Sequence, residues 1–208
     1  MINNDMDRIF LRAFQSEDYI LINKWRNDAE IQKLVSASFK YVSLEIEKEW
    51  VRQKMMDNRN DIYLAICLND ESRQMIGYTS LNKIDYINRS VISGGIVIAD
   101  KKYQDGVIRF EVGLKIRELA FMHLNMNRLT AACIKEHIVS RVTIEASGYE
   151  YEGCRRQAIF KNGSYHDQYC YSMLRDEYLK KLEEGYYSLR EYAKRIKSIS
   201  SRIKKENF

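Results

Sequence analysis

Apolar residues follow two spacings along residues 1–175, and each spacing is typical of one kind of element. Short continuous or alternating apolar runs favour strands, whereas apolar residues at every third or fourth position favour amphipathic helices. The strand-like runs span 8–14, 62–68, 75–81, 91–99, 128–134, 149–160 and 165–174. The helix-like stretches span 17–25, 44–57, 107–121 and 137–146. This order predicts an α/β (α+β) fold in which helices cover the faces of a mixed sheet.

Residues 91–121 join an apolar strand to an amphipathic helix through the polar turn 100–106. The glycine pair 94–95 in the strand indicates either a bulge approached by another chain or a simple kink. The first N–H groups of a helix have no partner within it, and its N-terminus carries partial positive charge. The turn is therefore predicted to bind a phosphate group, with an ordinary strand–helix connection as the open alternative.

The last part of the chain, 176–208, carries a different pattern and is predicted to be a helical extension of the 1–175 domain. Apolar residues recur every seven positions at Leu182, Leu189, Ile196 and Ile203, with Tyr192 and Ile199 three residues after two of them. This stripe predicts a helix of about 25 residues, or two helices separated near Gly185. Packing on the domain, homodimerisation and binding of an acidic partner such as RNA remain open. The first two are favoured because apolar stripes are usually buried.

The net charge of the 208-residue chain is +5, and its placement is informative. From Arg190 to Phe208 there are seven basic and two acidic residues, a difference of 7 − 2 = +5. Residues 1–189 are therefore neutral overall, which makes nucleic acid an improbable partner for the domain.

Several classes of protein are excluded by simple patterns. The sequence contains no apolar run of about 18 residues, so no membrane span is expected. The N-terminus lacks the basic and apolar regions of a secretory signal. The four cysteines are irregularly spaced, and the three histidines have no metal-ligand spacing with them, so reduced thiols and no metal site are expected. A cytoplasmic protein is therefore predicted.

Motifs along most of the chain resemble those of one enzyme family. Met126–Leu129 is similar to a "gl-n-r-l" entry into a strand, and Glu136–Tyr149 to an "E-N-x-x-S…G-F" segment. The other matching segments are Glu111 with Ala120–Phe121, Glu152–Arg156 with Asn162–Asp167, and Trp25–Asp28. Residues 8–175 thus resemble the GNAT N-acetyltransferases, in particular the subgroup of ribosomal-protein N-terminal, spermidine and amino-sugar acetyltransferases. The resemblance implies a mostly antiparallel sheet and acetyl-CoA as co-substrate.

The resemblance also implies where acetyl-CoA binds. The pantetheine arm enters between the central and fifth strands, and the turn holds the pyrophosphate. The implied cofactor-binding residues are Ile98, Ala99, Gln104, Asp105, Gly106, Val107, Ile108, Arg109 and His137. The family pattern in the turn is Q/R-x-x-G-x-G/A, and this chain departs from it at Val107 and Arg109, where small residues are expected. Arg109 can pair with a phosphate, whereas Asp105 would repel one.

Two catalytic positions of the family carry other residue types here. Gly94 stands where relatives often carry a glutamate, and Ile144 stands where they often carry a tyrosine acid. The candidate catalytic residues are therefore His137, whose imidazole can act as base or acid, and Ser140, which matches a position near the thiol. A structural role is open for both. Tyr149 and Tyr165 are further candidate proton donors, and catalysis by positioning with a water relay is the remaining alternative.

The candidate acceptor-binding residues are Trp25, Arg26, Asn27, Tyr78 and Ser93. The resemblance at Trp25–Asp28 favours an amino sugar, possibly nucleotide-linked, as the small-molecule amine. A protein N-terminus or a polyamine is the alternative, and the polyamine is disfavoured because the 25–40 segment is not rich in acidic residues. A hypothesis of another class is a GNAT-like binding or assembly module that has lost catalysis.

Overall fold

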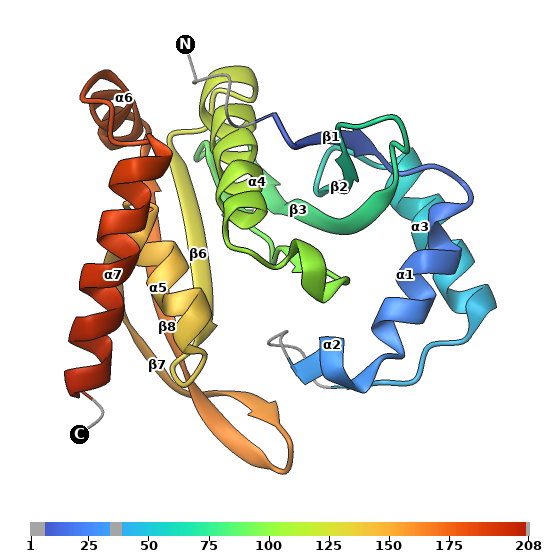
Figure 1. Ribbon diagram of the computed structural model, residues 1–208. Helices are drawn as coiled ribbons and strands as arrows, with labels where there is room; N and C mark the ends of the chain where they lie inside the picture. Colours follow the sequence, from blue (N-terminus) through green and yellow to red (C-terminus); the bar gives the residue numbers. More distant parts are fainter. Residues whose placement is uncertain (1–6, 34–38, 207–208) are drawn as a thin grey trace.

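The computed structural model describes residues 7–33 and 39–206, which form a mixed sheet with helices on its faces (Figure 1). Residues 34–38, part of the segment expected to border the acceptor, lie outside the described residues. The strands are β1 Ile9–Ala13, β2 Ile62–Leu68, β3 Met75–Asp85, β4 Ser90–Ser93, β5 Val97–Ile98, β6 Arg128–Ile134, β7 Glu150–Lys161 and β8 Ser164–Leu174. The α-helices are α1 Asp18–Arg26, α2 Ala29–Lys33, α3 Leu44–Met56, α4 Val107–Glu118, α5 Ile138–Ala146, α6 Arg175–Glu183 and α7 Leu189–Glu206.

The sheet has the order β1-β2-β3-β4-β6-β8-β7, with β5 paired to β3 beside this path. The β4–β6 pair is parallel, whereas every other pair along the path is antiparallel. The predicted mixed, mostly antiparallel sheet is therefore confirmed. The Asn162–Gly163 turn joins β7 to β8, and both of its residues have positive φ, as a two-residue hairpin turn requires.

The predicted continuous strand 91–99 is wrong, because the chain leaves the sheet at Gly94–Ile96 and separates β4 from β5. The Gly94 N–H donates to the Ser80 carbonyl at 2.8 Å, and a Cβ at Gly94 would lie 2.0 Å from the Ser80 Oγ. A larger residue would require the Ser80 side chain to move, so glycine suits this close approach to the neighbouring strand. β4 pairs with β6 whereas β5 pairs with β3, so the sheet opens between β5 and β6.

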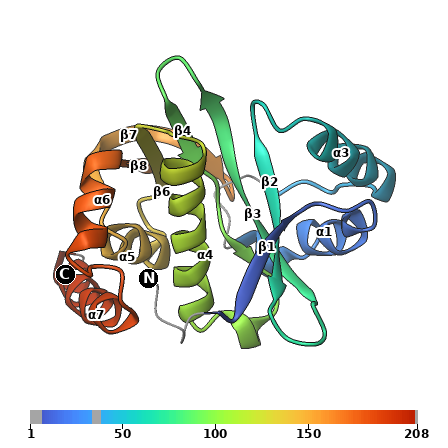
Figure 2. The same ribbon diagram turned by 90° about the horizontal axis from the view of Figure 1, so that it is seen from above.

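Helices on the two faces of the sheet bury two separate apolar clusters. Figure 2 shows β1, β2 and β3 between α1 and α3 on one face and α4 on the other. The smaller cluster lies under α1 and α3 and includes Ile22, Trp25 and Val51. The larger cluster lies under α4 and α5 and includes Phe110 and Phe121. The apolar face of each helix is thus used in packing against the sheet.

The C-terminal extension consists of two helices that pack on the larger cluster. The break between α6 and α7 contains Gly185, whose φ of +69° ends α6, so the two-helix alternative is the one observed. Tyr192 and Ile203 of α7 are buried, and Arg195 donates to the Ala146 carbonyl of α5 at 2.8 Å. The apolar stripe of α7 therefore faces the body, whereas Leu182 belongs to α6 and is exposed. Among the described helices, none combines the length and apolar character that a bilayer crossing requires.

Candidate active site

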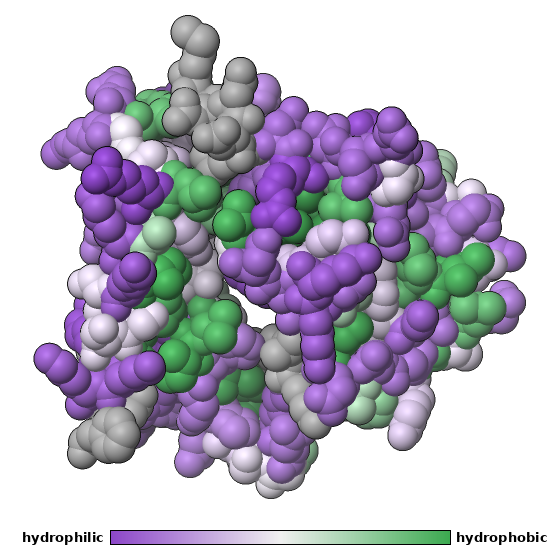
Figure 3. Space-filling model, in the orientation of Figure 1, coloured by the Kyte–Doolittle hydropathy of each residue, from purple (hydrophilic) through white to green (hydrophobic). Residues whose placement is uncertain are grey.

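A cavity of about 1170 Å³ occupies the opening between β5 and β6. Its walls come from β3, β5, the start of α4, β6, α5 and α7, and the surface in Figure 3 is hollowed near its centre at this place. Ten of the residues predicted from the sequence line it together: Arg26, Tyr78, Ile98, Gln104, Asp105, Gly106, Val107, Arg109, His137 and Ser140. Candidate cofactor, catalytic and acceptor residues are thus brought to one cavity.

Five predicted residues lie outside the wall of this cavity. Ile108 belongs to the apolar core, and Ala99 packs against the cluster under α1. Trp25 is buried with its ring stacked 6.3 Å from the Tyr78 ring. Asn27 exchanges hydrogen bonds with the Val42 backbone at 2.8 and 3.0 Å. Trp25 and Asn27 therefore support wall residues, and Ser93 lines a second, smaller cavity.

The N-terminus of α4 is capped from within the chain. The Asp105 Oδ1 accepts from the N–H groups of Val107 at 3.0 Å and Ile108 at 3.2 Å, and its Oδ2 pairs with Arg8 at 2.5 Å. Burial raises the pKa of Asp105, but the bonds from Arg8 and the two N–H groups outweigh it and leave the pKa below its usual value. Two N–H donors predicted to bind phosphate therefore already hold a carboxylate.

Arg109 brings a buried positive charge to the cavity. Its Nη1 donates to the Ile96 carbonyl at 3.2 Å, beside the opening between β5 and β6. Burial lowers the pKa of Arg109, and the nearby Tyr192 opposes this shift. Among the described residues, no carboxylate adds to this opposing effect. A desolvated guanidinium without a carboxylate partner is a favourable site for an anion such as a phosphate.

His137 and Ser140 meet at the first turn of α5. The His137 Nδ1 accepts from the Ser140 N–H at 3.1 Å, so His137 caps this helix. With Nδ1 as acceptor, the neutral imidazole carries its proton on Nε2 and can donate there but not accept. The geometry thus favours a donor role for His137 over a base. The Ser140 side chain lines the 1170 Å³ cavity and also the smaller cavity beside it.

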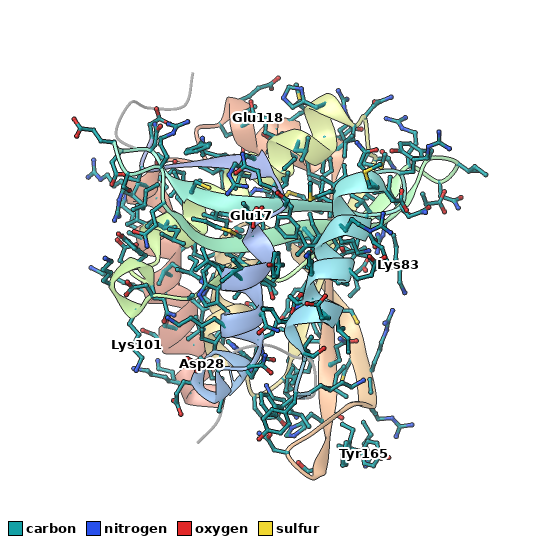
Figure 4. All side chains as sticks on the ribbon, turned by 90° about the vertical axis from the view of Figure 1, so that its right-hand side faces the viewer. Glu17, Asp28, Lys83, Lys101, Glu118 and Tyr165 are labelled. Atoms are coloured by element: carbon teal, nitrogen blue, oxygen red, sulfur yellow. The ribbon has the colours of Figure 1, made fainter. Side chains whose placement is uncertain are left out.

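The smaller cavity, about 120 Å³, lies behind the first and contains a residue that the sequence analysis missed. Arg117 is only 2% exposed, and its Nε and Nη2 lack a hydrogen-bond partner among the described residues. It bonds Tyr149, whose pKa is raised by burial against the opposing effects of Arg117 and Ser93. An arginine inside the apolar face of the predicted helix 107–121 was the available signal. Tyr165 projects from the far end of the β7–β8 hairpin (Figure 4) and lines neither cavity.

The end of the cavity near α1 is cationic. Arg26 lies 3.8 Å over the Trp50 ring and pairs at 3.2 Å with Glu47, which is fully buried behind it. Burial raises the pKa of Glu47, and the Arg26 charge opposes this rise. The charged residues of the whole cavity wall, apart from His137, are Arg26, Lys40, Arg109, Lys197 and Asp105. Since Asp105 is paired with Arg8, the cavity offers positive charge and no unpaired carboxylate among the described residues.

Comparison with known proteins agrees with this fold. Residues 8–150 match the model of the acetyltransferase (GNAT) domain, and the chain belongs to this family. It is 25% identical over 171 residues to the uncharacterized N-acetyltransferase YnaD of Bacillus subtilis, covering 82% of this chain and 96% of that protein. It is 29% identical over 104 residues to the putative ribosomal N-acetyltransferase YdaF of the same organism, covering 50% and 56%.

Solved structures share the fold at low sequence identity. The spermidine N-acetyltransferase from Vibrio cholerae in complex with CoA and spermine has a TM-score of 0.73 and 23% identity, over 83% of this chain and 98% of that one. A probable acetyltransferase has a TM-score of 0.73 and 23% identity, over 85% and 97%. These likenesses confirm the predicted GNAT fold. The family match makes the chain an N-acetyltransferase, and members of this family use acetyl-CoA as co-substrate.

The residues present fit acetyl-CoA in size and charge. The cavity is large enough, it lies along the opening between β5 and β6, and the buried Arg109 lacks a carboxylate partner among the described residues. Arg109 would hold the phosphates, and the apolar wall at Ile96–Ile98 would border the pantetheine arm. When bound, the thioester supplies an activated acetyl group. The one feature that opposes an anion is Asp105, whose charge is balanced by Arg8.

Proposed function

We propose that this acetyltransferase acetylates the primary amine of a small anionic molecule, with a phosphorylated or nucleotide-linked amino sugar as the first choice. The observation that supports this proposal is the charge of the cavity wall near α1, where Arg26 and Lys40 face the space and no unpaired carboxylate does among the described residues. Lys40 has no ion-pair partner among the described residues, whereas the charge of Arg26 is opposed by Glu47. The net positive charge at this end favours an acceptor that carries phosphate.

A polyamine is the weaker acceptor on the same grounds. Its ammonium groups need carboxylates, and in this cavity they would meet Arg26, Lys40, Arg109 and Lys197. The spermine of the Vibrio cholerae complex is a ligand of that protein, with which this chain shares 23% identity. A protein N-terminus is the second alternative, supported by the likeness to YdaF over half the chain.

Proton transfer in this proposal uses α5. The neutral amine attacks the thioester carbonyl, the C–N bond forms, the C–S bond breaks, and one proton must pass from nitrogen to sulfur. The Ser140 hydroxyl borders both cavities and gives its proton to the sulfur, while water in the cavity returns the amine proton to Ser140. His137 holds the first turn of α5 through its Nδ1 and so positions Ser140.

A catalytically impaired binding module is the competing hypothesis of another class. Two observations favour it: Asp105 occupies N–H donors at the start of α4, and a catalytic glutamate in place of Gly94 would collide with the Ser80 and Asn82 side chains where they now lie. An assay with a panel of amines separates the two hypotheses, because a binding module would acetylate none of them.

The test compares rates of acetyl transfer from acetyl-CoA to glucosamine 6-phosphate, a nucleotide-linked amino sugar, glucosamine, spermidine and a peptide N-terminus. We expect kcat/KM for at least one phosphate-bearing amine to exceed that for glucosamine by about tenfold, which corresponds to about 1.4 kcal/mol. Lys40→Gln should reduce this preference. Lys83→Gln is the matched control, since Lys83 lies near the C-terminal end of β3 (Figure 4) and does not line the cavity. A preference for spermidine would contradict the proposal.

A further inference from the structure

One face of α7 forms part of the cavity wall, although this helix lies beyond the 8–150 match to the family model. The α7 residues that line the cavity are Leu189, Tyr192, Ala193, Ile196, Lys197 and Ser200. Their spacing of three and four positions is that of a single helix face. The C-terminal extension therefore contributes a continuous surface to the site.

This face is held in place by contacts on both sides. The Tyr192 ring stacks on the Phe110 ring of α4, with centroids 4.0 Å apart and planes 18° apart. Arg195 donates to the Ala146 carbonyl at 2.8 Å and to the Tyr186 carbonyl at 2.9 Å. Arg202 forms an ion pair with Glu145 of α5. The helix is thus a fixed wall and not a flap over the opening.

The charges along this wall follow a pattern suited to two separated phosphate groups. Arg109 lies beside Tyr192, whose phenol contributes to its electrostatic environment. Lys197 follows Tyr192 by five residues in α7, which corresponds to a rise of about 7.5 Å along the helix axis. The two cations therefore meet the cavity at different positions along α7, as two phosphate groups separated by a ribose require. Lys197 borders the cavity and has no ion-pair partner among the described residues, whereas Lys194 is paired with Glu191 at 2.6 Å and lies off the wall.

We propose that α7 forms the adenosine side of the acetyl-CoA site, with Lys197 binding the 3′-phosphate of the ribose while Arg109 binds the diphosphate. The proposal rests on the acetyltransferase function above, and it adds a binding residue supplied by the C-terminal extension. Ala193 and Ile196, between the two cations on the same face, provide the apolar surface on which the adenine packs. A small residue at 193 leaves room for a planar base.

The test is calorimetric titration of the full-length chain with CoA and with 3′-dephospho-CoA, which differ only in the phosphate assigned to Lys197. Wild type should bind CoA about tenfold more tightly, a difference of about 1.4 kcal/mol. Lys197→Gln should lose most of this preference by weakening CoA binding while leaving 3′-dephospho-CoA binding unchanged. Lys194→Gln, on the same helix with the same change of charge, should keep the wild-type preference.

Each other result has a definite meaning. Equal affinity of wild type for the two ligands, or a Lys197→Gln variant that keeps the preference, would overturn the role of Lys197 and leave the acetyltransferase function standing. Failure of wild type to bind either ligand would overturn both the function and this inference. Ala193→Trp is an independent test of the α7 wall. This variant should weaken the binding of both ligands equally without lowering the melting temperature. Unchanged binding would contradict an adenine contact at Ala193.

Discussion

Gly94 shows how one residue determines both the shape of the sheet and the chemistry available to the site. A Cβ at this position would lie 2.0 Å from the Ser80 Oγ and 2.9 Å from the Asn82 Nδ2, so any side chain here, glutamate included, requires these two side chains of β3 to move. The chain leaves the sheet directly after this close approach and pairs again as β5. Gly94 therefore stands in place of the family's glutamate at the point where the sheet begins to open.

Replacing Gly94 with alanine should consequently destabilise the fold. We expect Gly94→Ala to lower the free energy of unfolding by about 1–3 kcal/mol, the usual cost of overpacking, as measured by urea denaturation. Gly95→Ala is the matched control, because a Cβ at Gly95 meets no atom within 4 Å. Equal free energies of unfolding for the two variants would show that the close contact with Ser80 does not determine the cost of a side chain at Gly94.

Arg109 is expected to affect acetyl-CoA binding and folding stability in opposite directions. A buried guanidinium without a carboxylate is costly to the fold and valuable to an anionic ligand. Arg109→Met should therefore weaken acetyl-CoA binding by about tenfold or more while the free energy of unfolding stays equal or rises. Calorimetry and denaturation measure the two quantities. A parallel loss of stability and binding would assign Arg109 a structural role instead.

At the scale of elements, the sequence was most informative where the periodicity was strong. The β7–β8 hairpin was recognisable from Asn162–Gly163, and α5 from its apolar spacing and Gly148. The break between β4 and β5 was not placed, because a kink and a bulge at Gly94 differ only through contact with Ser80, 14 residues earlier in the chain. Asp105, two residues before α4, is a recognisable capping residue, and its carboxylate competes with a phosphate for the same N–H groups.

The start of α4 gives the prediction at this scale. Asp105→Ala should lower the free energy of unfolding by about 1 kcal/mol, as loss of a helix cap does. Asp105→Asn retains a capping side chain and should cost less. Both variants should bind acetyl-CoA more tightly than wild type, because each removes a negative charge from the cavity. An Asn variant with unchanged affinity would show that Asp105 does not oppose the phosphates.

The same residue predicts a pH dependence. The pKa of Asp105 is lower in the folded chain than the value of about 3.9 for an unfolded aspartate. Its contribution to stability is therefore present above about pH 4 and is lost as the pH falls through the folded pKa. The stability difference between wild type and Asp105→Ala should be constant near neutral pH and shrink below about pH 4 in acid denaturation experiments. A difference that persists unchanged in acid would exclude this charge as its cause.

At the scale of the whole molecule, the C-terminal extension lies beyond the part of the chain that matches the GNAT domain. Its seven-residue spacing predicted burial correctly along α7 but not at Leu182, and the surface that receives α7 could not be read from the sequence. That surface is formed by α4 and α5 together, through Phe110 and Ala146, which are far apart along the chain. The position of Lys197 at the cavity follows from this long-range packing, so no local motif indicated it.

Binding of acetyl-CoA in the opening between β5 and β6 is tested most directly by hydrogen–deuterium exchange of the full-length chain with and without saturating acetyl-CoA. Amide exchange reports local protection along the sequence, so one experiment shows both whether the cofactor binds and where. We predict slower exchange in residues 95–98, 104–110, 132–143 and 189–200, which together line the cavity. Unchanged exchange throughout the chain, or protection confined to residues outside these segments, would contradict this assignment.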